Sequence, residues 1–243
     1  MYTGSHFAAS LGEALHSSWK DFLYDPQVSS NLLSAESQAL SGNFTPDPGR
    51  VLRFMTLPLG EMKVIVLGQD PYPTKGVATG RAFEVGGLKL WSQPFRNVSL
   101  KNILRGVYSS YKGFVTSYSG VINDPSFPVP PPGTLFDMWE RQGVMLLNTS
   151  FTCEIGRPGA HAGAWKNFTA LLLRYIAGEN PGLVWLLWGN HARRATAGIT
   201  IKNRLESMHP MMCYPGPGRE TDFLFGNLNH FHETRRLINW AGL

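Results

Sequence analysis

Three side chains of chemically active type come just after short apolar runs. Asp70 comes shortly after one run, Asn148 directly after a second, and His209 after a third, weaker one. A carboxylate in that position can orient water or face a developing positive charge, although an Asp before Pro most often simply forms a turn. An amide can read the polar edge of a planar ring, and a neutral imidazole can donate to an oxygen that gains negative charge. The set favours an enzyme site.

Two aromatic residues, Tyr72 and Phe83, are near the acid in the sequence. Such residues are usually part of the core, but aromatic faces beside an amide also suit a pocket for a planar heterocycle. The histidines and carboxylates do not have the spacing of a metal site, and two cysteines are too few for a zinc or iron–sulfur site with four thiolates. The sequence therefore predicts chemistry without a metal or a cofactor.

The elements expected to position these residues alternate between strand and helix. Buried strands are predicted at Lys63–Leu67, Val144–Leu147, Leu183–Trp188 and, more weakly, Arg204–Met208. Helical periodicity predicts helices over 11–23, over 99–111 with Ser99 as N-cap, over 165–176 with Gly178 as the stop, and over 232–240. The proline-rich stretch Asp124–Gly133 is expected to be an extended surface connection.

This alternation predicts an α/β fold with a central four-stranded, mainly parallel sheet and helices on both faces. Ligands of open parallel sheets bind beyond the carboxyl ends of the strands. We therefore expect Asp70, Asn148, the Gly189-Asn190 turn and His209 to meet at one edge. A length of 243 residues fits one domain over 1–243.

Composition narrows the class of protein. Hydrophobic residues make up 43% of the chain and charged residues 16%, which excludes a disordered protein. The net charge of +5 is compatible with a polyanionic partner, but the basic residues are dispersed. No apolar run is long enough to span a bilayer, and the segment Met1–Ser18 does not have the pattern of a secretion signal, so no membrane association is expected.

Several motifs, in order, resemble those of the family 1 uracil-DNA glycosylases. They cover about residues 60–240, whereas residues 1–55 match no motif beyond helical periodicity. The matching segments are Gly68-Gln69-Asp70-Pro71-Tyr72, Gly80-Arg81-Ala82-Phe83, 99–103, 139–148, 186–189, His209-Pro210, 225–226, 229–231 and 238–240. The resemblance implies a monofunctional DNA-repair hydrolase that flips uracil out of DNA and leaves an abasic site without a lyase step.

The resemblance also implies a role for each matching residue. Asp70 would position the attacking water and stabilise the cationic sugar, and His209 would donate to the uracil O2. Four residues would bind the uracil: Gln69 by contact, Tyr72 by excluding a methyl at C5, Phe83 by stacking and Asn148 by reading the polar edge. Four would contact DNA: Ser99, Pro210, Met211 and Met212.

The chain departs from the family pattern at two places. Pro73 replaces the usual His, so the water or phosphate contact of that His must be lost or moved, for example to Thr74 or Lys75. The loop after His209 lacks the serine and the leucine wedge of the family. Met211 or Met212 would then either wedge between bases or pack beneath a longer loop, and we expect a stronger preference for single-stranded over double-stranded DNA.

Two alternatives remain at this point. The chain could be a non-catalytic DNA-binding or replication-accessory protein of the same fold, or a glycosylase of the superfamily that acts on another damaged base. The expected partner is uracil-containing DNA, single- or double-stranded, bound by a monomer. The location implied is the nucleoid of a bacterial cytoplasm, or the nucleus if the chain comes from or infects a eukaryote.

Overall fold

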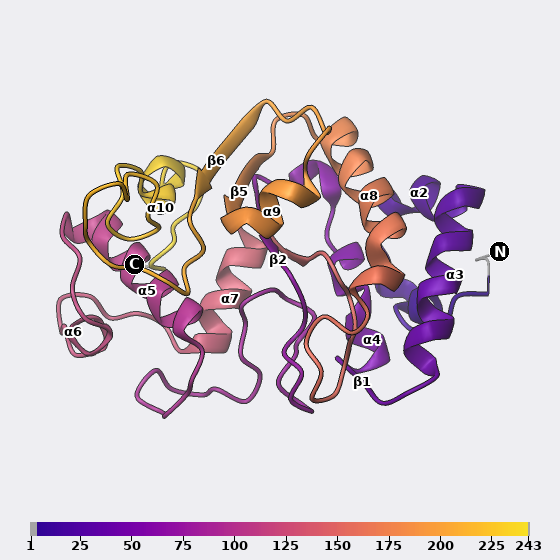
Figure 1. The fold of residues 1–243 in the computed structure, drawn as a ribbon, viewed down its shortest axis with the longest axis horizontal. Helices are drawn as coiled ribbons and strands as arrows, with labels where there is room; N and C mark the ends of the chain where they lie inside the picture. The colour runs from indigo at the N-terminus through magenta and orange to yellow at the C-terminus, as the bar shows by residue number, and fades with distance from the viewer. Residues whose placement is uncertain (1–3, 243) are drawn as a thin grey trace.

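A four-stranded sheet forms the centre of the molecule in the computed structural model, which describes residues 4–242 (Figure 1). The strands lie side by side in the order β3-β2-β5-β6, and all three pairs are parallel. Their bounds are β2 Val64–Gly68, β3 Val144–Asn148, β5 Val184–Trp188 and β6 Asn203–Ser207. The predicted α/β class and all four strands are confirmed, with each end within one residue of the prediction.

Side chains of each central strand alternate between two cores, one on each face of the sheet. In β2, Ile65 and Leu67 belong to the first core, whereas Val64 and Val66 belong to the second. This alternation explains why the central strands are apolar at every position: both faces are covered. The helices that cover them are α2 Lys20–Tyr24, α3 Pro26–Leu40 and α8 Ala162–Glu179 on the first face, and α5 Val98–Lys112, α7 Pro132–Arg141 and α10 His230–Thr234 on the second (Figure 1).

The other elements are short. They are the α-helices α1 His6–Ala9, α4 Pro48–Val51, α6 Tyr118–Ile122 and α9 Gly189–Ala195, the 3-10 turns Gly12–Ala14, Ser17–Trp19, Arg53–Thr56 and Leu59–Glu61, and the strands β1 Phe44–Thr45 and β4 Cys153–Glu154. Strands β1 and β4 pair antiparallel in a small second sheet. This pair ties the N-terminal region to the segment that follows β3.

The prediction of one continuous helix over 11–23 is wrong. Gly12 has a φ of 53°, which is incompatible with a right-handed helix, and His16 is extended. The chain instead makes two 3-10 turns before α2 begins. The apolar residues still reach the core, where the Trp19 indole donates to the Leu57 carbonyl over 2.8 Å. The hydrophobic spacing was therefore a sign of burial here and not of a continuous helix.

The predicted helix over 232–240 is also wrong. Helix α10 begins earlier, because Asn229 caps it by accepting from the backbone N–H groups of Phe231 and His232. It ends at Thr234, whose hydroxyl accepts a hydrogen bond from the Trp240 indole over 2.8 Å. Irregular chain held by side-chain contacts thus occupies the second half of the predicted helix.

Three predicted boundaries need correction. Asn97 is at the N-cap of α5, so Ser99 lies inside the first turn and is buried. Helix α8 continues through Gly178 and ends before Asn180, whose amide donates to the carbonyls of Leu59 and Met62. The proline-rich stretch first makes a turn, in which the Phe127 N–H donates to the Asp124 carbonyl over 3.0 Å, and Phe127 is buried. Helix α7 already begins at Pro132, where a missing N–H costs nothing.

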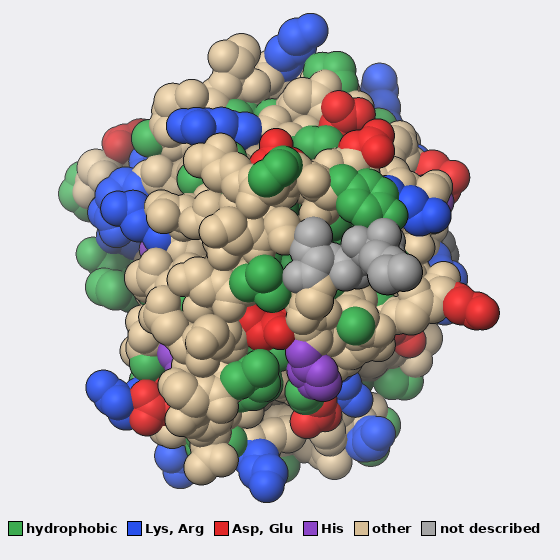
Figure 2. All heavy atoms as spheres, turned by 90° about the vertical axis from the view of Figure 1, so that its right-hand side faces the viewer, with side chains coloured by type: hydrophobic (Ala, Val, Ile, Leu, Met, Phe, Trp, Pro, Cys, Tyr) green, Lys and Arg blue, Asp and Glu red, His purple; other side chains and the backbone are tan. Residues whose placement is uncertain are grey.

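The face of the molecule formed around α2 and α3 carries basic and acidic side chains interspersed with neutral ones (Figure 2). On this face the described residues show the dispersed charge that the sequence predicts. Across residues 4–242, no helix is long and apolar enough to cross a membrane.

Candidate active site

A cavity of about 280 Å³ lies at the carboxyl ends of β2 and β3. Pockets for small ligands usually have about 300–1,000 Å³, so this one suits a single ring. Eight predicted site residues line it: Gln69, Asp70, Tyr72, Phe83, Ser99, Asn148, His209 and Met211. Gly68, Pro71, Pro73 and Pro158 complete the wall. The carboxylate and the imidazole, which are far apart in the sequence, therefore face one cavity.

Asp70 follows β2 after Gly68 and Gln69 and is half-buried. Its Oδ1 atom is buried and has no hydrogen-bond partner among the described residues. Burial raises the pKa of this carboxyl above its usual value, and the nearby His191 opposes that rise. Hydrogen bonding from the side chains of Ser150 and Gln69 also opposes the rise. A partly buried carboxylate of this kind gains energy from a positive charge that forms beside it.

Asn148 is the last residue of β3 and pairs in register with Gly68 of β2. The Asn148 side chain is buried and lies directly over Gly68. A Cβ atom at position 68 would collide with Asn148 Oδ1 and come within 2.8 Å of Ala82 Cβ. Gly68 is therefore required so that the amide can reach the cavity.

His209 follows β6 and is held at its ring nitrogen. The backbone N–H of Met211 donates to His209 Nδ1 over 3.1 Å, which leaves the Nε2 atom to carry the proton of the neutral ring. Burial lowers the pKa of His209, and the charge of His191 lowers it further. His209 is thus a neutral donor at neutral pH.

Gly189 makes room for His209 at the turn between β5 and α9. It has a φ of 84°, and a Cβ atom there would lie 2.9 Å from His209 Cβ. Both the backbone conformation and the close approach require glycine at this position. The sequence drew attention to the Gly189-Asn190 turn only as part of the edge of the sheet.

Tyr72 and Phe83 form the aromatic wall of the cavity. The Tyr72 hydroxyl donates to the Phe83 carbonyl over 3.3 Å, and burial raises the pKa of Tyr72 to about 12. Phe83 has a φ of 66°, a conformation that costs about 1–3 kcal/mol for a side chain of this kind. Its ring centroid lies 6.3 Å from that of His209. Such strain is typical of residues whose placement serves a site.

The segment 209–219 (the methionine loop) borders the cavity and is fastened at its base. Pro210 is buried, and its carbonyl accepts from the Asn102 amide of α5 over 2.7 Å. Arg219 donates to the Met212 carbonyl over 2.8 Å, forms an ion pair with the buried Asp222 and lies over the Tyr214 ring. Met211 and Met212 remain 59% and 66% exposed, so neither packs beneath the loop.

Pro73 lines the cavity, whereas Thr74 and Lys75 are exposed and are not among its lining residues. The transfer of the missing His contact to Thr74 or Lys75 stays a prediction. His191 of α9 interacts electrostatically with Asp70. From the sequence, His191 was rejected with the other histidines as a metal ligand, and no other role was assigned to it. The missed signal was the place of His191 directly after the Gly189-Asn190 turn.

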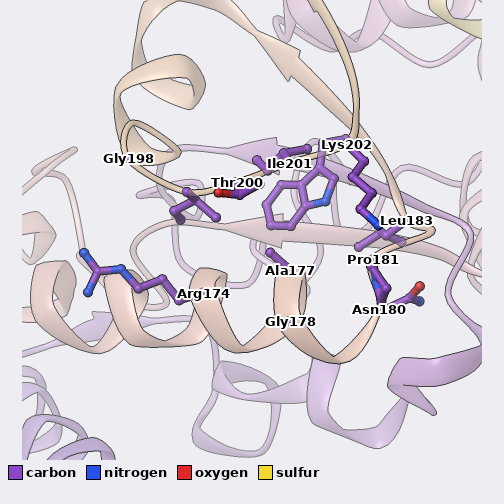
Figure 3. Close-up of a pocket in the computed structure, with 12 residues that line it drawn as sticks. Arg174, Ala177, Gly178, Asn180, Pro181, Leu183, Gly198, Thr200, Ile201 and Lys202 are labelled. Carbon is purple, nitrogen blue, oxygen red and sulfur yellow. The ribbon is translucent and has the colours of Figure 1, made fainter.

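Another cavity, of about 420 Å³, lies between α8 and the segment 198–202 (Figure 3). Arg174 and Lys202 stand at its rim, and Ala177, Leu183 and Ile201 contribute apolar surface. It opens near the start of β5 and thus away from the carboxyl ends of the strands. Asp70, Asn148 and His209 do not line it. We therefore assign the active site to the smaller cavity.

Comparison with known proteins shows the family of the chain. Residues 54–231 match the uracil DNA glycosylase superfamily. The chain is 31% identical to the uracil-DNA glycosylase of Azotobacter vinelandii, with 94% of this chain and 91% of that protein covered, and 32% identical to that of bovine herpesvirus 1.1, with 75% and 78% covered. The crystal structure of mimivirus uracil-DNA glycosylase superposes with a TM-score of 0.66 at 26% identity, covering 92% of this chain and 83% of that one. Motif order, fold and relatives agree: the chain belongs to the uracil DNA glycosylase superfamily.

Proposed function

We propose that the protein hydrolyses the N-glycosidic bond of uracil in DNA, releasing the free base and leaving an abasic site. One observation carries the proposal: the Asp70 carboxylate and the neutral His209 ring line the same single-ring cavity. A base inside duplex DNA cannot reach such a cavity, so the nucleotide must be flipped out of the stack. The cost of flipping is lowest in single strands and at mismatches.

Bond cleavage separates charge, and the two side chains fit the two products. As the bond breaks, the electron pair leaves with uracil N1 and the sugar becomes positive. Asp70, whose Oδ1 has no partner among the described residues, stabilises the sugar cation and orients a water molecule toward C1′. The water oxygen then bonds to C1′, and the proton it releases neutralises the uracil anion. With water as the nucleophile there is no covalent intermediate, and therefore no lyase step.

His209 acts on the leaving base. Its Nε2–H donates to the uracil O2, where negative charge accumulates, while the Met211 N–H fixes the ring through Nδ1. A donor that is aligned in advance in this way contributes about 3–4 kcal/mol to transition-state stabilisation. The lowered pKa of His209 keeps the ring neutral, so Nδ1 remains an acceptor.

Selectivity for uracil comes from the wall of the cavity. Tyr72 occupies the space beside C5 and excludes the methyl group of thymine, and Phe83 stacks on the ring. Asn148 pairs with the uracil carbonyl and would meet an amine in cytosine, a buried mismatch that strongly disfavours binding. Gln69 contacts the base from the end of β2.

The surface around the cavity is proposed to hold single- or double-stranded DNA, with the protein acting as a monomer. Met212, the most exposed of the predicted DNA-binding residues, is suited to wedge between bases. Met211 and Ser99 line the entrance, and Pro210 fixes the loop rather than presenting a contact surface. The cellular site of action is wherever the DNA lies, the nucleoid or the nucleus.

The test is uracil release from a defined oligonucleotide by the parent protein and by Asp70→Asn. We expect the variant to lose at least about 100-fold in rate, because the neutral amide cannot stabilise the cation, while DNA binding is retained. The matched control is Asp47→Asn at an exposed carboxylate whose side chain makes no cap hydrogen bond. Release at the parent rate by Asp70→Asn would refute the mechanism. A parent protein that binds DNA but releases no uracil would favour the non-catalytic alternative.

A further inference from the structure

Asp70 borders a second cavity besides the proposed uracil pocket. This cavity has a volume of about 360 Å³ and shares Gln69 and Asp70 with the active-site cavity. Thr149 and Ser150, which follow β3, and His191, in the first turn of α9, line it as well. Asp70 therefore borders both cavities, and groups that line this second cavity can help to hold the carboxylate in position.

A chain of hydrogen bonds runs from α9 to the residue before Asp70. The Thr149 hydroxyl donates to the Gln69 carbonyl over 3.2 Å and lies 2.6 Å from His191 Nε2. A hydroxyl has one proton, so if it is given to Gln69, His191 Nε2 must be the donor to Thr149. The Ser150 N–H also donates to the Gln69 carbonyl over 2.9 Å. The peptide that carries Asp70 is thereby fixed from two neighbouring elements.

The charges around Asp70 come from several elements. His191 and His161 both favour its ionised form, and His191 has the larger effect. Burial and the charge of Arg194 both lower the pKa of His191, while Asp70 raises it. The charge of His191 adds to the burial that lowers the pKa of His209. The charge of Asp70 adds to the burial that raises the pKa of the Cys153 thiol. In acid, the protonated His191 is the strongest nearby charge that keeps Asp70 ionised.

We propose that His191 is a positioning residue for the catalytic carboxylate, acting through Thr149 and the Gln69 carbonyl. It supports the water-activating segment from α9 in a chain where position 73 of that segment is proline and cannot donate. This role rests on the proposed uracil-releasing activity. It lies outside the predicted uracil contacts, because His191 does not line the smaller cavity.

The first test compares His191→Leu with His191→Gln in single-turnover and steady-state uracil release. His191→Leu removes the donor to Thr149, so kcat should fall about 10-fold or more, as expected for a misplaced catalytic group, while KM changes little. Gln can supply an amide N–H at similar reach and should restore most of the rate. His232→Leu on α10, at an exposed histidine, is the matched control.

The second test asks whether the effect runs through Thr149. Thr149→Val keeps the shape and removes the hydroxyl, and the double variant with His191→Leu should lose little more than either single variant. Additive losses, or a loss that His191→Gln does not restore, would show a merely structural role and overturn the proposal. Unchanged kcat in His191→Leu would overturn it as well.

The third measurement is the pH dependence of kcat/KM. Without His191 the pKa of Asp70 rises, so the carboxylate protonates earlier on acidification and the acid limb moves to higher pH in both variants. If the acid limb of kcat/KM lies at the same pH in the parent and in both variants, His191 does not help to keep Asp70 ionised, which contradicts that part of the proposal. Thermal unfolding of each variant identifies a protein that has failed to fold, in which case His191→Gln carries the comparison. If the parent itself releases no uracil, the proposed function fails and this role, which rests on it, fails with it, whereas a parent that releases uracil no faster than His191→Leu overturns this role alone.

Discussion

Single atoms decide whether the side chains of this site can meet. Gly68 and Gly189 leave space for Asn148 and His209, and in each case a Cβ would be closer to its neighbour than real Cβ atoms come. A single hydrogen bond has a comparable effect at His209, where the Met211 N–H donates to Nδ1 and so selects the tautomer that donates from Nε2. Residue types that read as ordinary turn formers in the sequence therefore set the geometry of the chemistry.

A substitution at Gly68 tests whether the space available to the Asn148 side chain limits uracil release, because it leaves Asp70 and His209 unchanged. Gly68→Ala should lower kcat/KM for uracil release about 10-fold or more, because its methyl group displaces the Asn148 amide and presses on Ala82. Steady-state kinetics on a uracil oligonucleotide measure this. Gly60→Ala is the control, since a Cβ there meets nothing within 4 Å. Parent-like kcat/KM in Gly68→Ala would mean that Asn148 does not depend on this clearance.

At the scale of elements, strand ends carry the proposed reacting groups and one loop carries the proposed DNA contact. Parallel strands bring their carboxyl ends to a common edge, so Asp70 after β2 and Asn148 of β3 become neighbours. The methionine loop is fixed at its base by Asn102 of α5 and by Arg219. Its tip is left with exposed apolar side chains, a combination suited to insertion between bases.

The wedge assignment predicts a difference between substrates. Met212→Ala should reduce excision from double-stranded DNA about 10-fold while changing single-strand excision little, because only the duplex must be unstacked. Parallel rates on the two forms of one oligonucleotide measure the ratio. Leu40→Ala removes an equally apolar, 48% exposed side chain from α3 as control. An unchanged ratio in Met212→Ala would exclude Met212 as the wedge.

At the scale of the whole molecule, two cores enclose the sheet, and the N-terminal region belongs to the first of them. Phe7, Trp19 and Leu32 pack in the same cluster as Ile65 of β2 and Trp165 of α8. We propose on this basis that the chain is one domain in which residues 4–55 have a structural role. The second core contains a buried titratable group, His230, which accepts from the Trp188 indole over 2.9 Å.

Burial of His230 should make the fold sensitive to acid. Burial lowers the pKa of His230 to about 4, whereas in the unfolded chain this pKa is near 6.5. Between these two values the unfolded chain binds a proton that the folded chain does not bind. The contribution of His230 to stability is therefore complete above pH 6.5 and is lost as the pH falls toward 4. Between pH 7 and pH 5 the parent should lose about 2 kcal/mol of unfolding free energy from this group. Urea unfolding at the two pH values measures the loss.

His230→Gln is the control for this effect, since its amide oxygen can still accept from Trp188 but does not titrate. The variant should lose less stability than the parent between pH 7 and pH 5. An equal loss would show that other groups cause the acid sensitivity.

The sequence by itself determined strands β2, β3 and β5, because strands buried on both faces must be apolar, whereas the polar strand β6 at the edge of the sheet was indicated only weakly. It also indicated the edge at which Asp70, Asn148 and His209 meet, because strand direction alone fixes which ends are shared. It failed for the helices over 11–23 and 232–240, where apolar spacing records burial whether or not the backbone between contacts is helical. Only the tertiary structure decided the clearance at Gly68, the tautomer of His209 and the link from His191 to Gln69. Those features depend on distances of a few ångströms between segments remote in sequence, which no local pattern encodes.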